Sequence, residues 1–455
     1  MTRRSLILAA LVALLVPAFL PAQNPAPTPP MGWNSWDAYG LTIDEADFKA
    51  NTAVLAGLKQ YGWEYSVIDE GWYMQNPFGD KVETKKYVFD GNGIQIPATN
   101  RFPSSADGAG FKPMADWVHA QGLKFGIHIV RGIPHQVVDE NLPIAGTSFH
   151  AVDAADKSAP CPWDDGNWGV SDTPAGQAYY DSMLKLYAGW GLDYIKVDCV
   201  SDHPYRPTEI LQIAEAIKKT GRSIVLSLSP GPTDIAYAEF VGKYAQMWRI
   251  TDDHWDVWKA VKKPADGEFP FGIREAFDRL ALWAPYVKPG NWPDDDMLPF
   301  GWLGPHPGWG EARQSRETHD EQRTEFTLWV FARSPLILGA NLTRLDEFTR
   351  SLITNREVLE INQKAVETHA VKDLPAGFEN ARVWEARTGS GQQERSSFAF
   401  FNLDDQPATL RATWEQLGLP SKHAARNLWD GSKLKVSEGI EVTLPAHGST
   451  IYRVE

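Results

Sequence analysis

Hydrophobic and polar residues follow two different patterns along the chain, and each pattern predicts a different kind of structure. In the first three quarters, short apolar runs alternate with longer segments of helical periodicity. The runs interpreted as strands are Met31–Trp36, Tyr65–Asp69, Lys124–His128, Tyr194–Asp198, Ser223–Leu228, Gln246–Arg249, Met297–Phe300 and Leu336–Leu338. Strands separated by helices form parallel sheets, and eight such units predict a closed (β/α)₈ TIM barrel.

Helical patterns fill the spaces between these runs. The expected helices are Asp44–Gln60, Phe111–Gln121, Gly176–Gly189, Pro207–Thr220, Trp255–Lys263 and His319–Phe331. A long insertion, residues 131–173, interrupts the alternation after the third strand, and loops of that length in compact domains are usually functional. It contains an aromatic and polar stretch from Cys161 to Trp168. We therefore predict a barrel domain over residues 23–364 with one functional insertion.

The last quarter of the chain has the second pattern. Its runs are shorter, rich in β-branched alternation and separated by Gly, Asp and Pro turns. The expected strands are Ala381–Ala386, Ser397–Phe401, Ala408–Thr413, Ala425–Leu428 and Glu441–Arg453. This pattern predicts a C-terminal antiparallel β-sandwich over residues 365–455.

The first 22 residues have the composition of a secretory signal peptide. Arg3 and Arg4 precede the apolar run Leu6–Val16, and the small residue Ala22 offers a cleavage position. The run is too short for a comfortable membrane span, and neither cysteine lies beside the cleavage position, so we predict an exported protein without a membrane anchor, in the periplasm or the medium. The formal net charge of −14 argues against nucleic acid as a partner and favours a neutral substrate.

Lys196 and Asp198 are two residues apart in a run that otherwise reads as a buried strand, so both side chains point to one face. A buried ion pair contributes little to stability, which favours a functional site at the end of this strand. Active sites of such barrels lie at the C-terminal ends of the strands. The polar residues collected there are Asp69, Glu70, His128, Ser227, Ser229, Arg249, Asp253, Asp294, Asp295 and Asp296, with Trp33 and Trp36 beside the first strand.

This set of side chains points to glycoside chemistry on a carbohydrate substrate. Carboxylates supply the nucleophile and acid that the reaction needs, and the chain holds 19 tryptophans, whose faces stack on sugars. Asp198 beside Lys196 should stay ionised, as a nucleophile must, whereas Asp253 among other acids should keep a proton. Their separation is not readable from sequence, so retention and inversion both stay open.

No cofactor or metal is predicted. The chain shows neither a Gly-rich phosphate loop nor a metal-type histidine cluster. Asp294, Asp295 and Asp296 could ligate calcium, but the run lacks the spaced ligands and central glycine of an EF-hand loop.

Six motifs occur in a fixed order between about residues 29 and 341. They are Met31–Trp36, Ile68–Trp72, Lys196–Asp198, Gly221–Val225, Trp248–Arg249 with Asp253, and Trp292–Leu298. Together they resemble the α-galactosidases of glycoside hydrolase family 27. The resemblance implies an exo-acting hydrolase that removes terminal α-linked galactose from oligosaccharides or glycans by double displacement, with retention. It places Asp198 as nucleophile and Asp253 as acid/base.

The same resemblance implies further roles. The residues that it assigns to sugar binding are Trp36, Asp69, Lys196, Arg249 and Asp296. The family also carries a disulfide beside the nucleophile, which Cys161 and Cys199 could reproduce.

Three residues depart from the usual pattern of this family. Glu70 stands where typical members have an aspartate, His128 replaces a tyrosine, and Ser229 replaces a glutamate that contacts the sugar 2-hydroxyl. Serine at that place is similar to the α-N-acetylgalactosaminidases. The sequence therefore leaves open an α-N-acetylgalactosaminidase and a β-L-arabinopyranosidase of the same family. A non-catalytic carbohydrate-binding protein is a further alternative, disfavoured because Asp198 and Asp253 are both present.

Overall fold

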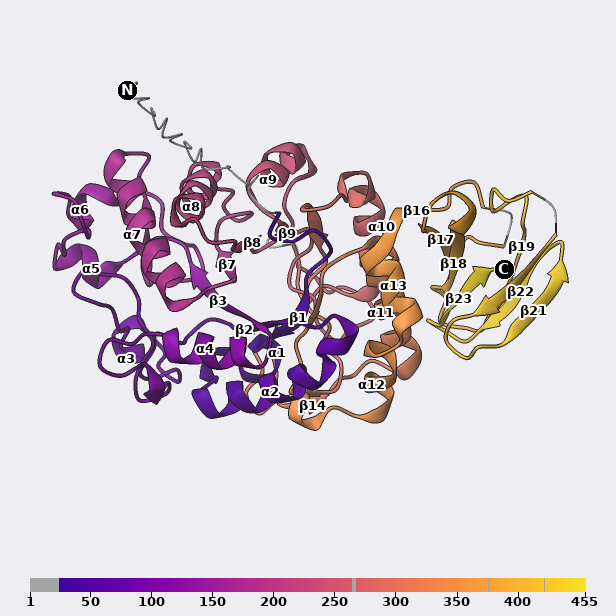
Figure 1. Ribbon diagram of the computed structural model, residues 1–455, viewed down its shortest axis with the longest axis horizontal. Coiled ribbons are helices and arrows are strands. Elements are labelled where there is room, and N and C mark those ends of the chain that lie inside the picture. Colours follow the sequence, from indigo (N-terminus) through magenta and orange to yellow (C-terminus); the bar gives the residue numbers. More distant parts are fainter. Residues whose placement is uncertain (1–23, 264–266, 375–376, 421) are drawn as a thin grey trace, which may run out of the picture.

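The computed structural model describes residues 24–263, 267–374, 377–420 and 422–455. The predicted signal segment, residues 1–22, lies outside these ranges. Figure 1 shows a barrel of strands ringed by helices, with a smaller body of strands docked against one side. Within the described ranges, no helix combines the length and apolar character needed to cross a membrane.

The described residues form a parallel sheet of eight strands, which confirms the predicted barrel. Its strands in chain order are β1 (Met31–Asn34), β2 (Tyr65–Ile68), β3 (Lys124–Val130), β7 (Tyr194–Asp198), β8 (Val225–Leu228), β9 (Met247–Arg249), β12 (Trp292–Asp294) and β15 (Leu336–Leu338). Neighbours follow the chain order from β1 to β12, and β15 pairs with β1. The segment after β12 completes the circle, because the Leu298 amide donates to the Ile337 carbonyl at 2.8 Å.

Two predicted elements of the barrel are wrong. The seventh strand is Trp292–Asp294 and not Met297–Phe300, since a strand ending in acidic residues does not read as an apolar run. The predicted helix Trp255–Lys263 is irregular backbone apart from the short strand β10 (Lys262–Lys263). Its amides bond across the loop and not along a helix: Val261 donates to the Pro270 carbonyl at 3.0 Å.

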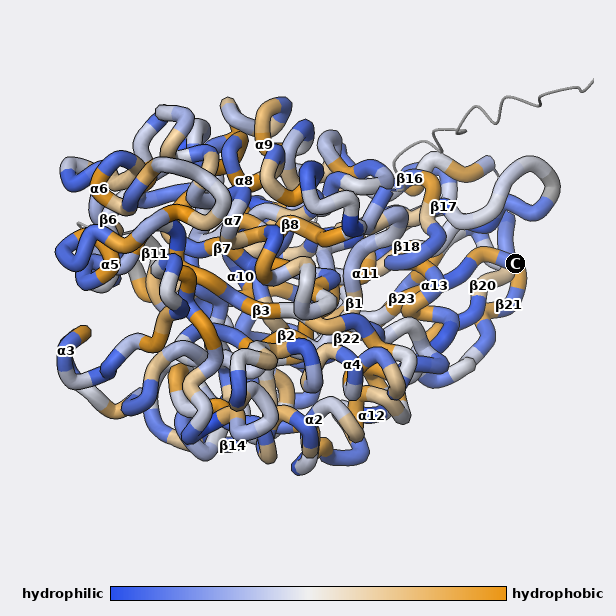
Figure 2. Tube along the Cα trace, turned by 60° about the vertical axis from the view of Figure 1, so that its left-hand side comes forward, coloured by the Kyte–Doolittle hydropathy of each residue, from blue (hydrophilic) through white to orange (hydrophobic). Residues whose placement is uncertain are grey.

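Helices cover the outside of the barrel. The longer ones are α2 (Glu45–Leu58), α4 (Lys112–Ala120), α7 (Pro174–Trp190), α8 (Pro207–Thr220), α9 (Ala238–Tyr244), α10 (Ile273–Trp283), α11 (His319–Ala332), α12 (Glu347–Ile353) and α13 (Arg356–Lys364). Most of their buried residues are apolar, and Figure 2 shows hydrophobic segments concentrated along the strands inside this ring. Helix α11 is buried over nearly its whole length, so its polar residues need internal partners.

The insertion at residues 131–173 has a fold of its own. It contains β4 (Ile133–Pro134), α5 (His135–Asp139), α6 (Ala151–Ala154), β5 (Ala155–Asp156) and β6 (Asn167–Val170). The three strands form a small sheet with β6 in the centre. A disulfide between Cys161 and Cys199 ties it to the end of β7.

The C-terminal body is antiparallel, as predicted, but the predicted strand Glu441–Arg453 is two strands, because the Gly448 amide donates to the Pro445 carbonyl in a turn between them. Its strands are β16 (Ala365–Ala370), β17 (Ala381–Thr388), β18 (Arg395–Asn402), β19 (Ala408–Thr413), β20 (His423–Asn427), β21 (Lys433–Ser437), β22 (Gly439–Leu444) and β23 (Ser449–Val454). Alternation along β18 explains both packing faces: Phe398 and Phe400 fill the sandwich, whereas Phe401 points to the barrel and meets Phe277 at 4.9 Å between ring centroids. The sandwich therefore packs directly on the barrel.

Candidate active site

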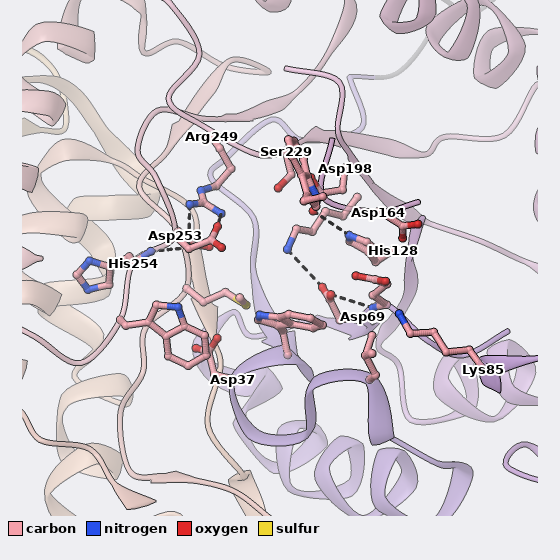
Figure 3. A pocket seen from close by; sticks show the side chains of 18 of the residues that line it. Asp37, Asp69, Lys85, His128, Asp164, Asp198, Ser229, Arg249, Asp253 and His254 are labelled. Atoms are coloured by element: carbon pink, nitrogen blue, oxygen red, sulfur yellow. Dashed lines mark hydrogen bonds and ion pairs between the residues drawn. The ribbon is translucent and has the colours of Figure 1, made fainter. Parts of the chain in front are cut away.

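The strand that carries Lys196 and Asp198 lies in the middle of the sheet, and its neighbours present polar side chains at the same level. Register places His128 of β3 beside Lys196. Lys196 Nζ lies 3.3 Å from Asp69 Oδ2, and His128 Nε2 lies 3.3 Å from Asp198 Oδ2. Figure 3 shows Asp69, His128 and Asp198 converging on one pocket, which Lys196 also lines. The charges of the central strand are therefore paired with charges of the neighbouring strands.

Asp69 is the most completely satisfied carboxylate of the pocket. Its oxygens accept from the Asn34 amide at 2.6 Å and from the Glu70 backbone at 2.8 Å, in addition to the contact with Lys196. Burial alone would raise its pKa, but the charges of His128 and Lys196 and these hydrogen bonds lower it to about 2. Asp69 is therefore ionised throughout the neutral range and can accept hydrogen bonds from sugar hydroxyls.

Asp198 is held as a carboxylate by similar means. The Cys199 amide donates to Asp198 Oδ1 at 2.6 Å, and Cys199 itself has a left-handed backbone with φ of 63°. Burial favours the neutral form, but the hydrogen bond and charge of His128, together with Lys196, lower the pKa of Asp198 below its ordinary value. The group thus has the ionisation state of a nucleophile.

The opposite wall of the pocket is built around Arg249 at the end of β9. Its guanidinium lies 3.3 Å from Asp253 and 2.9 Å from Asp296. Asp296 also accepts from the His254 amide at 2.9 Å, with its own backbone in the left-handed region. Partial burial and the neighbouring Asp296 and Asp198 raise the pKa of Asp253 against the lowering effect of Arg249. Asp253 therefore retains a proton more readily than Asp198 does.

The insertion forms the third wall. Buried Arg131 donates to the carbonyls of Cys199, at 2.6 Å, and Ala159, at 3.1 Å, so the disulfide and this side chain fix the same loop. Beyond Cys161 the loop brings Trp163 and Asp164 to the pocket, and 49 % of Trp163 is exposed. The insertion thus supplies an aromatic surface at the mouth.

Glu70 and Asp164 face each other across the junction of two walls. Burial, the Asp164 charge and other nearby acids raise the pKa of Glu70 to about 8, with His128 acting in the opposite direction. Burial also raises the pKa of Asp164. At neutral pH Glu70 therefore holds a proton and can donate a hydrogen bond, unlike Asp69 beside it.

One cavity of about 300 Å³ is lined by Trp36, Asp69, Glu70, His128, Lys196, Asp198, Ser229, Arg249, Asp253 and Asp296, whereas Trp33, Ser227, Asp294 and Asp295, which were also collected at the strand ends, do not line it. Their individual roles remain predictions. The other lining residues are Asp37, Leu41, Lys85, Trp163, Asp164, Asp165, His254, Trp255 and Met297. The aromatic and polar stretch Cys161–Trp168 was expected to be functional, and it supplies Trp163, Asp164 and Asp165, although no individual role was predicted for them. Lys85 has no sequence signal, because it lies in the short helix α3 (Val82–Lys85), far from any strand end.

Comparisons with known proteins place this architecture in a family. Residues 162–364 match the family model "Alpha galactosidase A", and residues 379–454 match "Alpha galactosidase C-terminal beta sandwich domain". The α-galactosidase of Coffea arabica is 31 % identical over 433 residues, which cover 93 % of each chain. The chain belongs to the α-galactosidase family, glycoside hydrolase family 27. Alpha-galactosidase A of Cellvibrio japonicus is 28 % identical, covering 94 % of this chain and 92 % of its own.

Two solved structures show how the family members vary. A β-L-arabinopyranosidase of family 27 from Geobacillus stearothermophilus has a TM-score of 0.87 and 39 % identity, covering 95 % of this chain and 97 % of its own. A candidate α-N-acetylgalactosaminidase from Bacillus halodurans has a TM-score of 0.80 and 39 % identity, covering 94 % of this chain and 97 % of its own. The chain is accordingly a glycosidase.

The departures from the usual pattern of family 27 all fall on the pocket. His128 contacts Asp198 directly, Ser229 follows β8 and is buried, and Glu70 joins Asp164. These three residues lie on the side of the pocket formed by β2, β3, β8 and the insertion, across from Arg249, Asp253 and Asp296.

Proposed function

We propose that the protein is a retaining exo-α-galactosidase that releases terminal galactose. The observation that carries the proposal is the difference between two carboxyl groups at one pocket: the pKa of Asp198 is lowered and that of Asp253 is raised. Such a pair is what glycoside hydrolysis requires of its nucleophile and its acid. Retention follows from membership of the family.

The reaction proceeds in two displacements. Asp198 attacks the anomeric carbon while the bond to the leaving oxygen breaks, and Asp253 gives its proton to that oxygen. The product is a covalent glycosyl ester of Asp198. Water then attacks the same carbon, Asp253 accepts the proton of that water, and the carboxylate of Asp198 is released.

Pocket size and lining support an exo-acting enzyme. The cavity of about 300 Å³ lies at the small end of ligand sites, which suits one terminal sugar ring better than a chain. Asp69 and Asp296 accept hydrogen bonds from hydroxyl groups, and Lys196 and Arg249 donate them. Trp36 offers an aromatic face to the ring. Trp163, exposed at the mouth, contacts the leaving group.

A second candidate, β-L-arabinopyranosidase, is favoured by Glu70. β-L-Arabinopyranosides present the ring hydroxyls of α-galactosides without the C6 arm, and a glutamate occupies more of the pocket than the usual aspartate. The likeness to the Geobacillus structure supports the same candidate. Ser229 similarly favours an α-N-acetylgalactosaminide, because a small residue leaves room beside the 2-position.

A substrate screen separates these candidates. The purified protein is tested on the p-nitrophenyl α-galactoside, α-N-acetylgalactosaminide and β-L-arabinopyranoside, and kcat/KM is compared. The highest value for the α-galactoside supports the proposal, and a higher value for either other substrate reassigns the sugar. No release from any of them refutes catalysis and favours a carbohydrate-binding protein. Proton NMR of the first-formed product tests retention.

The cell compartment is inferred from residues 1–22. We propose that this segment directs export to the periplasm or the medium. Fractionation of the native cells, with detection of the full-length chain, tests it. Recovery with the cytoplasmic proteins would contradict export.

A further inference from the structure

Behind the wall that carries Asp253 lies a second cluster of titratable side chains. It consists of His254, which follows Asp253 in sequence, Glu317, which lies just before α11, and Glu325 on α11. One nitrogen or oxygen of each lies within 4.8 Å of the others, and the exposed fractions are 1 %, 6 % and 0 %. Figure 3 shows the His254 ring directed away from the sugar pocket. The cluster is therefore separate from the groups proposed to act on substrate.

These side chains lack the hydrogen bonds that such buried groups normally have. His254 Nε2 lies 3.2 Å from Glu325 Oε1. Yet in the described part of the chain, neither ring nitrogen of His254 has a partner of acceptable hydrogen-bond geometry, and Glu317 and Glu325 receive no hydrogen bond except the one that a proton between their own two carboxyl groups would make. An uncompensated buried carboxylate is costly, so a group with positive charge or a proton must balance it.

The surroundings add negative charge. Asp37 and Asp295 are also buried, and within the described ranges their carboxylates accept no hydrogen bond either. Asp256 is the exception: it accepts from Arg313 at 2.5 and 2.8 Å. That guanidinium is already committed to Asp256 and to backbone carbonyls. Among the described ion pairs, Glu325 is paired only with His254, and neither Glu317 nor Glu325 is paired with a lysine or an arginine, which leaves a place for a bound cation between the three side chains.

We propose that His254, Glu317 and Glu325 bind one divalent cation of the first transition row. Bonds of about 2.0–2.2 Å in tetrahedral geometry put ligand atoms about 3.3 Å apart, close to the His254–Glu325 separation of 3.2 Å. One imidazole nitrogen with two carboxylates is a ligand set that suits Zn²⁺ and Mn²⁺. The site goes beyond the proposed glycosidase function and does not depend on the identity of the sugar.

The ion would fasten the loop of the acid/base residue to helix α11. The His254 backbone amide donates to Asp296, which in turn pairs with Arg249. A metal bound to the His254 ring therefore holds His254 in place. The residues directly before and after His254 form part of the pocket wall. Its ligands hold the loop in position and take no part in the bond changes at the sugar.

The direct test is metal content of the full-length protein. It is purified without chelating resin, analysed by inductively coupled plasma mass spectrometry, stripped with a chelator and reloaded with Zn²⁺ or Mn²⁺ separately. We expect about one ion per chain before stripping or after reloading, and a Tm that falls on stripping and recovers on reloading. Anomalous scattering from crystals should place the ion between His254 and the two glutamates.

Two matched variants locate the site. Glu325→Gln keeps the volume of the side chain and removes one ligand charge, so the metal content should fall at least about tenfold. Glu321→Gln makes the same change one helical turn earlier, where the carboxylate bonds His447 and the Thr318 amide. This control should retain the metal.

Three results would overturn the proposal. Less than about 0.1 ion per chain after reloading with both metals would show that Glu317 and Glu325 hold protons instead. A Glu325→Gln protein with unchanged stoichiometry would put the ion elsewhere. An anomalous peak away from His254 would do the same. The wild-type measurements stand whether or not the variants fold.

Discussion

Two groups of carboxylates lie at the same end of the barrel and differ in their surroundings. Asp69, Asp198 and Asp296 face the pocket, and each accepts from a cationic side chain and a backbone amide. Asp37 lines the pocket, whereas Asp295, Glu317 and Glu325 do not, and within the described ranges no N–H or hydroxyl group donates a hydrogen bond to any of these four carboxyl groups. Asp69 and Asp198 are ionised because these partners lower the pKa of both groups. The second group must take up protons or a cation.

This difference shows how one barrel keeps acids in opposite states a short distance apart. Charge pairing lowers a carboxyl pKa, whereas burial without partners raises it. The pKa of Asp69 is about 2, and that of Asp295 is raised well above its ordinary value, since burial is reinforced by Asp294. Substitutions in the two groups should therefore have different consequences.

The largest effect is expected at the nucleophile. Asp198→Asn removes the attacking charge while keeping the shape of the side chain, so kcat should fall about 10⁴-fold or more. Steady-state hydrolysis of the best aryl glycoside measures it. Asp193→Asn, just before the opposite end of β7, is the control and should keep near-normal kcat. Loss of less than about tenfold in Asp198→Asn would reject the role.

The loss of activity in Asp253→Asn should depend on the leaving group of the substrate. The amide donates no proton, so natural disaccharides should lose about 10²–10⁴-fold in kcat/KM, whereas p-nitrophenyl substrates should lose much less, because p-nitrophenolate leaves without protonation. Kinetics on both substrate types measure the split. Equal losses on both would contradict a role as general acid.

A pair of asparagine substitutions compares stability directly. Asp69 has a pKa of about 2, below its unfolded value of 3.8, so its contribution is present above the unfolded value and lost as pH falls through about 2. Asp69→Asn should therefore lower the unfolding free energy by about 2 kcal/mol at pH 7. Asp37→Asn removes a carboxyl with no donor and should be neutral or stabilising. Urea unfolding at pH 7 measures both unfolding free energies. Equal losses in the two variants would contradict the difference between the two groups of carboxyls.

The smallest effect is expected at Glu70, and it appears in pH dependence. The folded pKa of about 8 lies above the unfolded value of 4.5, so stability is greatest below the unfolded value and declines as pH rises to about 8. Glu70→Gln mimics the protonated form. It should remove this decline in Tm and move the alkaline limb of kcat/KM upward by about one pH unit. An unchanged limb would show that another group sets it.

The sequence predicted most of the barrel because its strands are apolar runs with helices between them. Residues 194–198 and 336–338 were predicted with the bounds that the structure has. The seventh strand was misplaced because its end, Asp294, looks like loop, and Trp255–Lys263 was called a helix although its amides bond across the loop. In the sandwich, β16 and β21 were missed, since half or more of their residues are exposed or polar. The pattern of apolar residues along the chain reflects which side chains are buried, and few side chains of these segments are buried.

The pocket residues that lie at the ends of barrel strands could be predicted from the sequence. Asp69, His128, Lys196 and Asp198 each end or nearly end a strand, and the barrel brings strand ends together. Trp163 and Lys85 depend on loops whose paths are set by tertiary contacts. The cluster of His254, Glu317 and Glu325 escaped notice because only the packing of α11 brings residues more than 60 positions apart into contact.

The disulfide that ties the insertion to β7 bears on the order in which the pocket is assembled as well as on its shape. Asp198 and Asp253 sit on the barrel itself, but Trp163 and Asp164 follow Cys161 in the loop that the bond holds. In a reducing compartment this loop would be held by Arg131 and its neighbours without the covalent link. A newly made chain would then possess its catalytic pair before its third wall was secured. In the exported state that we propose, oxidation would then secure the wall that faces the leaving group.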